Sequence, residues 1–126
     1  MIDALFNDPN YLAAKKSLDA VALRQEAIAS NLANLETPGY KRVDLAPSFK
    51  AELDRACAAG DANQIAACRP ALAADPNAVP TGRDGNTVNF ESEMMKLNEN
   101  MLTHALETQL VSGALLKMKL AISGKT

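Results

Sequence analysis

The sequence predicts an all-α protein in which two long terminal helices pair as an antiparallel, coiled-coil-like hairpin. An irregular, partly mobile middle segment is expected between them. Two observations support this fold: apolar residues recur every three or four positions near both ends of the chain, and the middle is rich in alanine and interrupted by proline. The chain also has only three Phe, two Tyr and no Trp. Because aromatic side chains bury the most area, the expected core is thin, which suits helices packed side by side. The predicted divisions are 1–40, 41–88 and 89–126.

The first helix is expected to begin at Asp8-Pro9, since Asp is a good N-cap and Pro fits the first helical position. Its apolar seam, broken only by a glutamine, consists of Tyr11, Ala14, Leu18, Val21, Gln25, Ile28, Leu32 and Leu35. The helix must end before Pro38, because proline disfavours a helical residue before it. Thr37–Tyr40 then predicts a tight turn, with Gly39 supplying a positive φ.

The middle segment, 41–88, predicts a loop or mobile insert with short helical pieces. Residues 48–59 fit a short helix with Phe49 and Leu53 on one side. Alanine is frequent further on, but three prolines interrupt it and few large apolar side chains are available to offset the entropy of ordering. Residues 81–86 have the composition of a turn.

The last helix is expected to begin at Asn89, a plausible N-cap, with Glu91 and Glu93 near the positive end of the helix dipole. Gly124 is a candidate C-terminal cap. The apolar seam of this helix comprises Met94, Leu97, Met101, His104, Thr108, Val111, Leu115, Met118 and Ile122.

Several leucines lie off these seams and widen the apolar faces beyond what one partner helix covers: Leu12, Leu23, Leu102, Leu106, Leu110 and Leu116. A wide exposed apolar face usually marks an interaction surface, so neighbouring molecules are its expected cover. An ordinary small helical bundle, with the middle segment supplying a third helix, is the alternative. Periodicity alone does not separate the two.

Residues 30–41 read SNLANLETPGYK, which is similar to the N-terminal signature shared by flagellar rod, hook and hook–filament junction proteins. Residues 24–29, just before it, also resemble that family. Within the family, the short chain and residues 84–94, DGNTVNFESEM, resemble the proximal rod proteins of the basal body. The resemblance covers both ends of the chain, and the middle shows no usable match.

This resemblance implies a structural subunit of the proximal rod, exported unfolded by the flagellar type III apparatus and assembled helically in the periplasm. The implied partners are copies of the chain, other rod proteins, the adaptor protein FliE and the flagellar export gate. Another rod or axial component, or a helical adaptor of a secretion system, are the alternatives. Candidate assembly residues lie on the seams and in the signature: Leu18, Val21, Ile28, Asn31, Leu32, Asn34, Leu35, Thr37, Pro38, Gly39, Tyr40, Met94, Leu97, Met101, Val111, Leu115, Met118 and Ile122.

The sequence has no motif that indicates an enzyme, a cofactor site or a nucleic-acid-binding surface. It contains no phosphate-binding Gly loop, HExxH or nucleophile elbow, so we expect no catalytic residue, cofactor or small-molecule substrate. The net charge is −2 without a basic patch, whereas nucleic-acid affinity depends on cationic contacts to phosphate. The single histidine, His104, is expected to be a buried or interface residue, and the seam methionines are expected to fill packing gaps.

The two cysteines, Cys57 and Cys68, do not form a CxxC pair, so a structural zinc site is not expected. Two free thiols in a mobile segment are the first expectation, and a disulfide in an oxidising compartment is the alternative. The first residues have neither the basic nor the apolar region of a cleaved signal peptide. No apolar run reaches the length of a membrane span.

Overall fold

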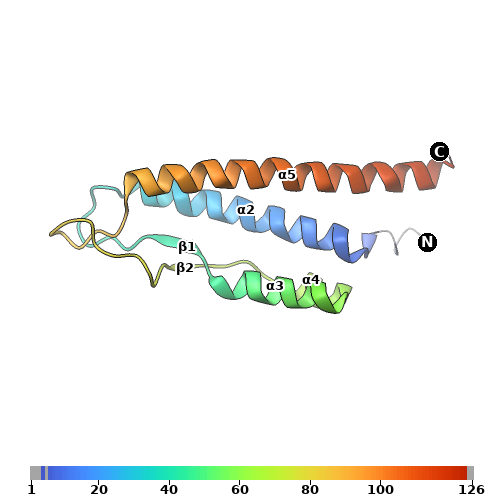
Figure 1. Cartoon of the computed structure of the whole chain (residues 1–126), viewed down its shortest axis with the longest axis horizontal. Helices are drawn as coiled ribbons and strands as arrows, with labels where there is room; N and C mark the ends of the chain where they lie inside the picture. The colour runs from blue at the N-terminus through green and yellow to red at the C-terminus, as the bar shows by residue number, and fades with distance from the viewer. Residues whose placement is uncertain (1–3, 5, 125–126) are drawn as a thin grey trace.

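The protein is described by a computed structural model that covers residue 4 and residues 6–124. Two long helices dominate it: α2, Pro9–Ala33, has 25 residues, and α5, Phe90–Ser123, has 34 residues. At 1.5 Å per residue they are about 38 and about 51 Å long. They run antiparallel, and the start of α2 and the end of α5 lie at the same end of the molecule (Figure 1). The predicted terminal-helix hairpin is therefore confirmed.

The helix ends lie where the capping residues predict them. The Asp8 carboxylate accepts a hydrogen bond from the Asn10 backbone N–H at 2.8 Å. The Asn89 side chain accepts one from the Ser92 N–H at 2.9 Å. Gly124 ends α5 in the left-handed region, with φ of 66°. These contacts satisfy backbone groups that have no partner within the helix.

The chain leaves α2 through the predicted turn at Thr37–Tyr40. The Tyr40 N–H donates to the Thr37 carbonyl at 3.2 Å, and Gly39 has φ of 71°. A Cβ placed on Gly39 would meet nothing within 4 Å, so the requirement for glycine is conformational rather than steric.

The middle segment is more regular than expected. Helix α3, Pro47–Ala59, matches the predicted short helix and begins one residue earlier. Strand β1, Val43–Leu45, pairs antiparallel with β2, Leu72–Ala74, and the six-residue helix α4, Ala62–Ala67, lies between α3 and β2. The strands were not predicted, because three residues are too few for a period-two pattern to stand out.

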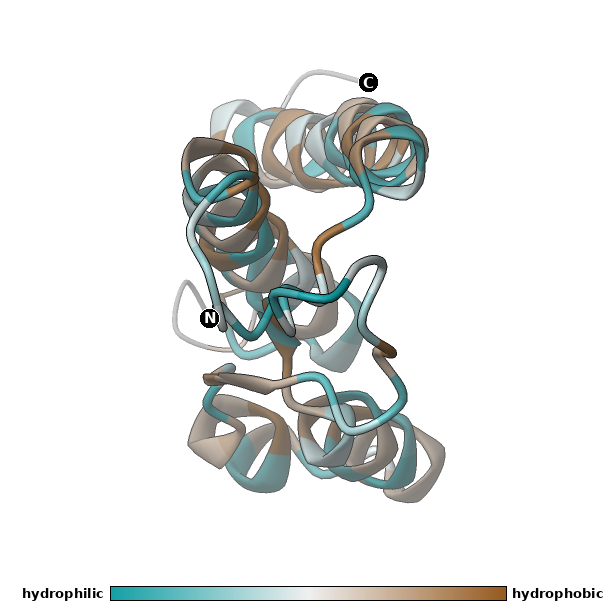
Figure 2. Cartoon of the chain, turned by 90° about the vertical axis from the view of Figure 1, so that its left-hand side faces the viewer, coloured by the Kyte–Doolittle hydropathy of each residue, from teal (hydrophilic) through white to brown (hydrophobic). Residues whose placement is uncertain are grey.

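The main apolar core lies between α2 and the middle segment. Its buried members are Ala20, Phe49, Leu53, Ala56, Ile65 and Cys68. The expectation that the middle segment has too few large apolar residues to pack is wrong, because α2 supplies the opposite wall. Figure 2 shows α5 on one side of α2 and the α3–α4 pair on the other, which makes α2 the central layer. The alternative of a small helical bundle therefore also holds in part, because α3 of the middle segment packs on α2 as a third helix.

Helix α5 has only a narrow buried face. Glu93, Asn100 and Met118 are its buried residues. Across the part of the chain that the structure describes, no helix is both long enough and apolar enough to cross a membrane.

Substituting Gly39 tests the turn. We expect Gly39→Ala to destabilise the fold by about 1–2 kcal/mol, because an L-residue is strained at this φ. Gly113→Ala, inside α5, serves as the control and should stabilise the fold by about 0.5–1 kcal/mol through helix propensity. Urea denaturation followed by circular dichroism at 222 nm measures both changes. Equal effects of the two substitutions would contradict the assigned turn.

Candidate functional site

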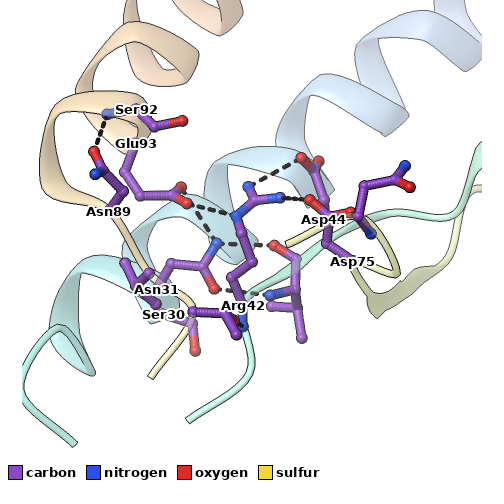
Figure 3. Close-up of polar contacts among 12 residues, drawn as sticks. Ser30, Asn31, Arg42, Asp44, Asp75, Asn89, Ser92 and Glu93 are labelled. Carbon is purple, nitrogen blue, oxygen red and sulfur yellow. Dashed lines mark hydrogen bonds and ion pairs between the residues drawn. The ribbon is translucent and has the colours of Figure 1, made fainter. Parts of the chain in front are cut away.

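A cluster of polar side chains joins the end of α2 to the start of α5 (Figure 3). It lies at the closed end of the hairpin, where the segment after α2 meets the segment before α5. We call it the polar junction, and its members are Ser30, Asn31, Asn34, Tyr40, Arg42, Asp44, Asp75, Asn86, Thr87 and Glu93.

Arg42 is the centre of the polar junction. Its side chain is only 6% exposed, and its guanidinium contacts three carboxylates. Nε donates to Glu93 Oε1 at 2.7 Å, Nη2 donates to Asp44 Oδ2 at 3.1 Å, and Nη1 donates to Asp75. Burial opposes the charge, but the contacts with these carboxylates outweigh it and raise the pKa of Arg42 above its ordinary value. The guanidinium is therefore a permanent buried cation held from three separate segments.

Asn31, which is fully buried on α2, pairs with the backbone of β1. Its Nδ2 donates to the Val43 carbonyl at 2.8 Å, and its Oδ1 accepts from the Val43 N–H at 2.9 Å. The amide thus imitates the backbone of a neighbouring strand. Nδ2 also lies 3.3 Å from Glu93 Oε2, so one side chain links α2, β1 and α5.

Asn86 caps the end of α2 from a segment far away in the sequence. Its Nδ2 lies 2.9, 3.1 and 2.8 Å from the carbonyl oxygens of Asn34, Leu35 and Thr37. Its Oδ1 accepts from the Val88 N–H at 2.7 Å. The carbonyls of Asn34 and Thr37 also accept from the N–H groups of Thr37 and Tyr40, so the Asn86 amide adds a second partner to each and ties the turn after α2 to residues 84–88.

Backbone hydrogen bonds complete the connection between the turn after α2 and residues 84–87. The Gly39 N–H donates to the Asp84 carbonyl at 2.8 Å, and the Thr87 N–H donates to the Tyr40 carbonyl at 3.0 Å. The two sequence motifs singled out above therefore bind each other within one molecule.

The signature residues proposed for assembly have internal partners. The Tyr40 hydroxyl lies 3.0 Å from Ser30 Oγ and donates to Asn31 Oδ1 at 3.3 Å, and Asn34 Nδ2 donates to the Ser30 carbonyl at 2.8 Å. The roles of Arg42 and Glu93 were not predicted from the sequence. Arg42 directly follows the signature, and Glu93 was assigned to the helix dipole, so only their proximity in the fold reveals the pair.

The other predicted assembly residues fall into three groups. Val21, Ile28 and Met118 are buried within the molecule. Leu18, Leu32, Leu35, Met94, Leu97 and Val111 are half-buried. Thr37, Pro38, Gly39, Met101, Leu115 and Ile122 are exposed. His104 is exposed as well, so of the two positions expected for it, buried or at an interface, only the interface position stays a prediction.

A second apolar stripe runs along α5 on the side facing away from α2. We call it the outer stripe, and it consists of Met95, Leu102, Leu106, Leu110, Leu116 and Leu120. These side chains are between 41% and 74% exposed. Their spacing of four, six or seven residues places them on one helix face, opposite the face that carries Glu93, Asn100 and Met118. Four of the six are leucines that the sequence analysis placed off the seam.

An open groove of about 710 Å³ separates α2 from α5 near the chain ends. Its lining includes Tyr11, Ala14, Glu107 and Met118, together with Leu110, which lies at the edge of the outer stripe nearest the groove. Burial raises the pKa of the Glu107 carboxyl above its ordinary value. The two helices are thus less tightly packed here than at the polar junction.

Neither the junction nor the groove has the arrangement of a metal centre. Among residue 4 and residues 6–124, no group of three His, Cys, Asp or Glu side chains is placed to hold a metal ion. The cysteines are free thiols, with Cys57 exposed and Cys68 buried.

Comparison with known proteins identifies the family. A sequence profile described as "Flagella basal body rod protein" matches residues 13–41, which contain most of α2 and the turn after it. The chain is 36% identical over 112 residues to the flagellar basal body rod protein FlgB of Cereibacter sphaeroides, covering 81% of this chain and 84% of that protein. It is 31% identical over 115 residues to FlgB of Borrelia hermsii, covering 77% and 83%. Identity to FlgB of Escherichia coli K12 is also 31%, over 118 residues and 79% and 82% of the two chains.

The chain belongs to the FlgB family of flagellar basal body rod proteins. The resemblance predicted from SNLANLETPGYK and DGNTV is therefore confirmed, as is the prediction of a structural, non-enzymatic protein of the rod. The match to the family profile ends at Lys41. The next residue is Arg42, the buried arginine that joins this segment to α5 through Glu93.

Removing Glu93 tests the polar junction. Glu93→Ala leaves the Arg42 cation buried without its fully buried partner, and breaking a buried ion pair in this way costs about 3–5 kcal/mol. Glu91→Ala is the matched control, because Glu91 is exposed in the same helical turn. Urea denaturation should show a large fall in the midpoint for the first variant and little change for the second. Similar midpoints would refute the role given to Glu93.

Asp75 gives the junction a defined dependence on pH. The Asn77 N–H, which donates to its carboxylate at 2.9 Å, lowers the pKa of Asp75, and Arg42 lowers it further against the opposing effect of burial. Because the folded pKa lies below the unfolded value of about 3.9, its stabilising contribution is present above about pH 4 and is lost in more acidic solution. Asp75→Asn should therefore flatten the acid limb of a stability–pH curve. Asp19→Asn, at an exposed site on α2, should leave that limb unchanged, and an acid limb unaltered by Asp75→Asn would contradict the assignment.

Proposed function

We propose that this chain is exported by the flagellar type III apparatus and packs helically against copies of itself and other rod proteins through α2 and α5. The observation that carries this proposal is the outer stripe. Six large apolar side chains lie exposed along one face of a helix whose opposite face already contacts α2. A stripe of this kind is costly in water and is expected to be covered by a neighbouring subunit.

The exposed members of the predicted seam extend this surface around α5. Met101, Leu115 and Ile122 lie outside the outer stripe and are between 42% and 62% exposed. One neighbour in contact with a single face would leave part of this surface uncovered. Several neighbours around each α5, as in a helical assembly, would cover it.

The polar junction supports the same proposal from inside the molecule. It fixes how far α5 is shifted along α2, because Asn31 and Glu93 must meet at one position. Every subunit then presents its stripe at the same height and angle. A repeated contact requires this uniformity.

The periplasmic location and the contacts with the FliE adaptor and the export gate are parts of the proposal that follow from the family's place in the basal body. A small core is compatible with export as an unfolded chain, since a thin core opens at modest cost. The curated relatives are described as rod proteins, which makes other rod proteins the first partners to test.

A charge placed on the outer stripe tests the assembly surface. Leu106→Asp should leave the isolated subunit folded, because Leu106 is 58% exposed, with stability changed by no more than about 0.5 kcal/mol. In the rod it would bury an unpaired carboxylate, at a cost of several kcal/mol. In a strain lacking its own copy, the variant should be exported yet fail to restore swimming.

Asn63→Asp is the control for that experiment, since Asn63 is an exposed polar residue of α4, on the other side of α2 from α5. It should restore swimming. Normal motility with Leu106→Asp, together with normal export, would show that the outer stripe is not an assembly contact.

A further inference from the structure

We propose that Asn100 is a positioning residue that sets the crossing angle between α5 and α2, and with it the place of the far half of α5. Asn100 belongs to neither the polar junction nor the outer stripe. It is only 2% exposed and is one of the three buried residues of α5. The angle decides where the outer stripe lies, and only this consequence for assembly rests on the proposed function.

Asn100 makes two hydrogen bonds to α2 through one amide group. Its Nδ2 donates to the Val21 carbonyl at 3.0 Å and to Gln25 Oε1 at 3.2 Å. A side-chain amide nitrogen carries two N–H groups, so both are used. Gln25 is the one polar residue in the seam that the sequence predicts for α2, and this contact explains why a polar side chain suits that position.

This contact is a second fixed point on α5. Glu93, through which the polar junction holds the helix, lies about two turns earlier, or about 10 Å along the axis. A helix held only in its first turns has a direction that is sensitive to small changes, whereas two separate points define a line. Hydrogen bonds have preferred distances and angles, so this second point restricts the crossing angle more sharply than apolar packing does.

The far half of α5 depends on this second point. Among the described residues, no hydrogen bond joins α2 to α5 beyond Asn100, and those of Thr103 and Ser123 are made within α5. Past Asn100 the two helices border the open groove. Residues 101–123 therefore form an arm about 35 Å long, and a rotation of about 10° about the polar junction would move the end of α5 by about 8 Å.

Replacing Asn100 by leucine separates the position of α5 from the stability of the fold. The Val21 carbonyl keeps its partner within α2, and Gln25 is exposed to water, so Asn100→Leu leaves no buried polar group unpaired. Leucine also supplies apolar contact in place of the amide. We therefore expect the variant to stay folded, with the circular dichroism at 222 nm of the unsubstituted chain.

Distances between spin labels at the two ends of the hairpin test the proposal on the isolated full-length chain. Cys57→Ser and Cys68→Ala remove the native thiols, and each residue to be labelled is replaced by cysteine. The two labelled pairs occupy exposed positions: Lys15 with Lys119 at the open end, and Ala29 with Glu91 at the closed end.

Double electron–electron resonance measures both distances. In the Asn100→Leu variant, we expect the open-end distance to shift or broaden by on the order of 5 Å, because the arm magnifies a small rotation at its base. The closed-end distance should stay unchanged, because the polar junction is intact. A residue that merely stabilised the helix pair would not alter one end alone.

Two further variants complete the test. Asn98→Leu, at an exposed position of α5, is the matched control and should change neither distance. Gln25→Ala removes one of the two acceptors and should shift the open end in the same direction by less, which keeps the test available if Asn100→Leu does not fold. The proposal is overturned if neither Asn100→Leu nor Gln25→Ala changes the open-end distance, if both ends change equally, or if Asn98→Leu has the same effect. The chain is measured without neighbours, so each result is independent of whether the subunit assembles as proposed.

Discussion

The contact between the Arg42 guanidinium and the Glu93 carboxylate constrains the rest of the structure. Arg42 follows the turn after α2, and Glu93 lies in the first turns of α5, yet both are buried and bonded at 2.7 Å. An unpaired charge in such a place is strongly unfavourable, so the ends of the two long helices must come together correctly or not at all. Asn31 adds directional hydrogen bonds to the same carboxylate and to β1. Apolar seams allow two helices to shift along each other, whereas the hydrogen bonds and ion pairs of this cluster form at one register only.

The two ends of the hairpin therefore differ: one fixes the register of the helices, and the other leaves apolar surface exposed. The closed end is polar, densely bonded and complete within one molecule. Towards the chain ends, α2 and α5 enclose an open groove, and the exposed leucines of α5 continue beside it. Register is therefore set at one end of the helix pair, while apolar surface remains uncovered towards the other. Helix α2 runs from one end of the hairpin to the other, with α5 packed on one side of it and the middle segment on another.

Much of the fold can be predicted from local chemistry in the sequence. Asp8, Asn89 and Gly124 mark helix ends through their capping preferences, and Pro38-Gly39 marks the turn, since these effects depend on neighbouring residues only. The polar junction could not be predicted in the same way. Glu93 is 51 residues from Arg42 and 62 residues from Asn31 in the chain, and an isolated Arg, Asn or Glu has no pattern that indicates burial. The core around Ile65 was missed for a related reason: its second wall is α2, so the composition of the middle segment alone underestimates the packing.

The internal use of Asn31, Asn34 and Tyr40 changes how the signature SNLANLETPGYK is understood. A motif identified through a family of assembling proteins is naturally assigned to the assembly contact. In this chain, however, its asparagines and its tyrosine hydroxyl bond within the subunit, and residues 84–87 are bonded to the same turn. Rod subunits that share a packing geometry need helices held in the same register before they meet. A polar motif meets that need better than an apolar one, because its hydrogen bonds form at one register only, and the less directional apolar surface of α5 is left for neighbouring molecules.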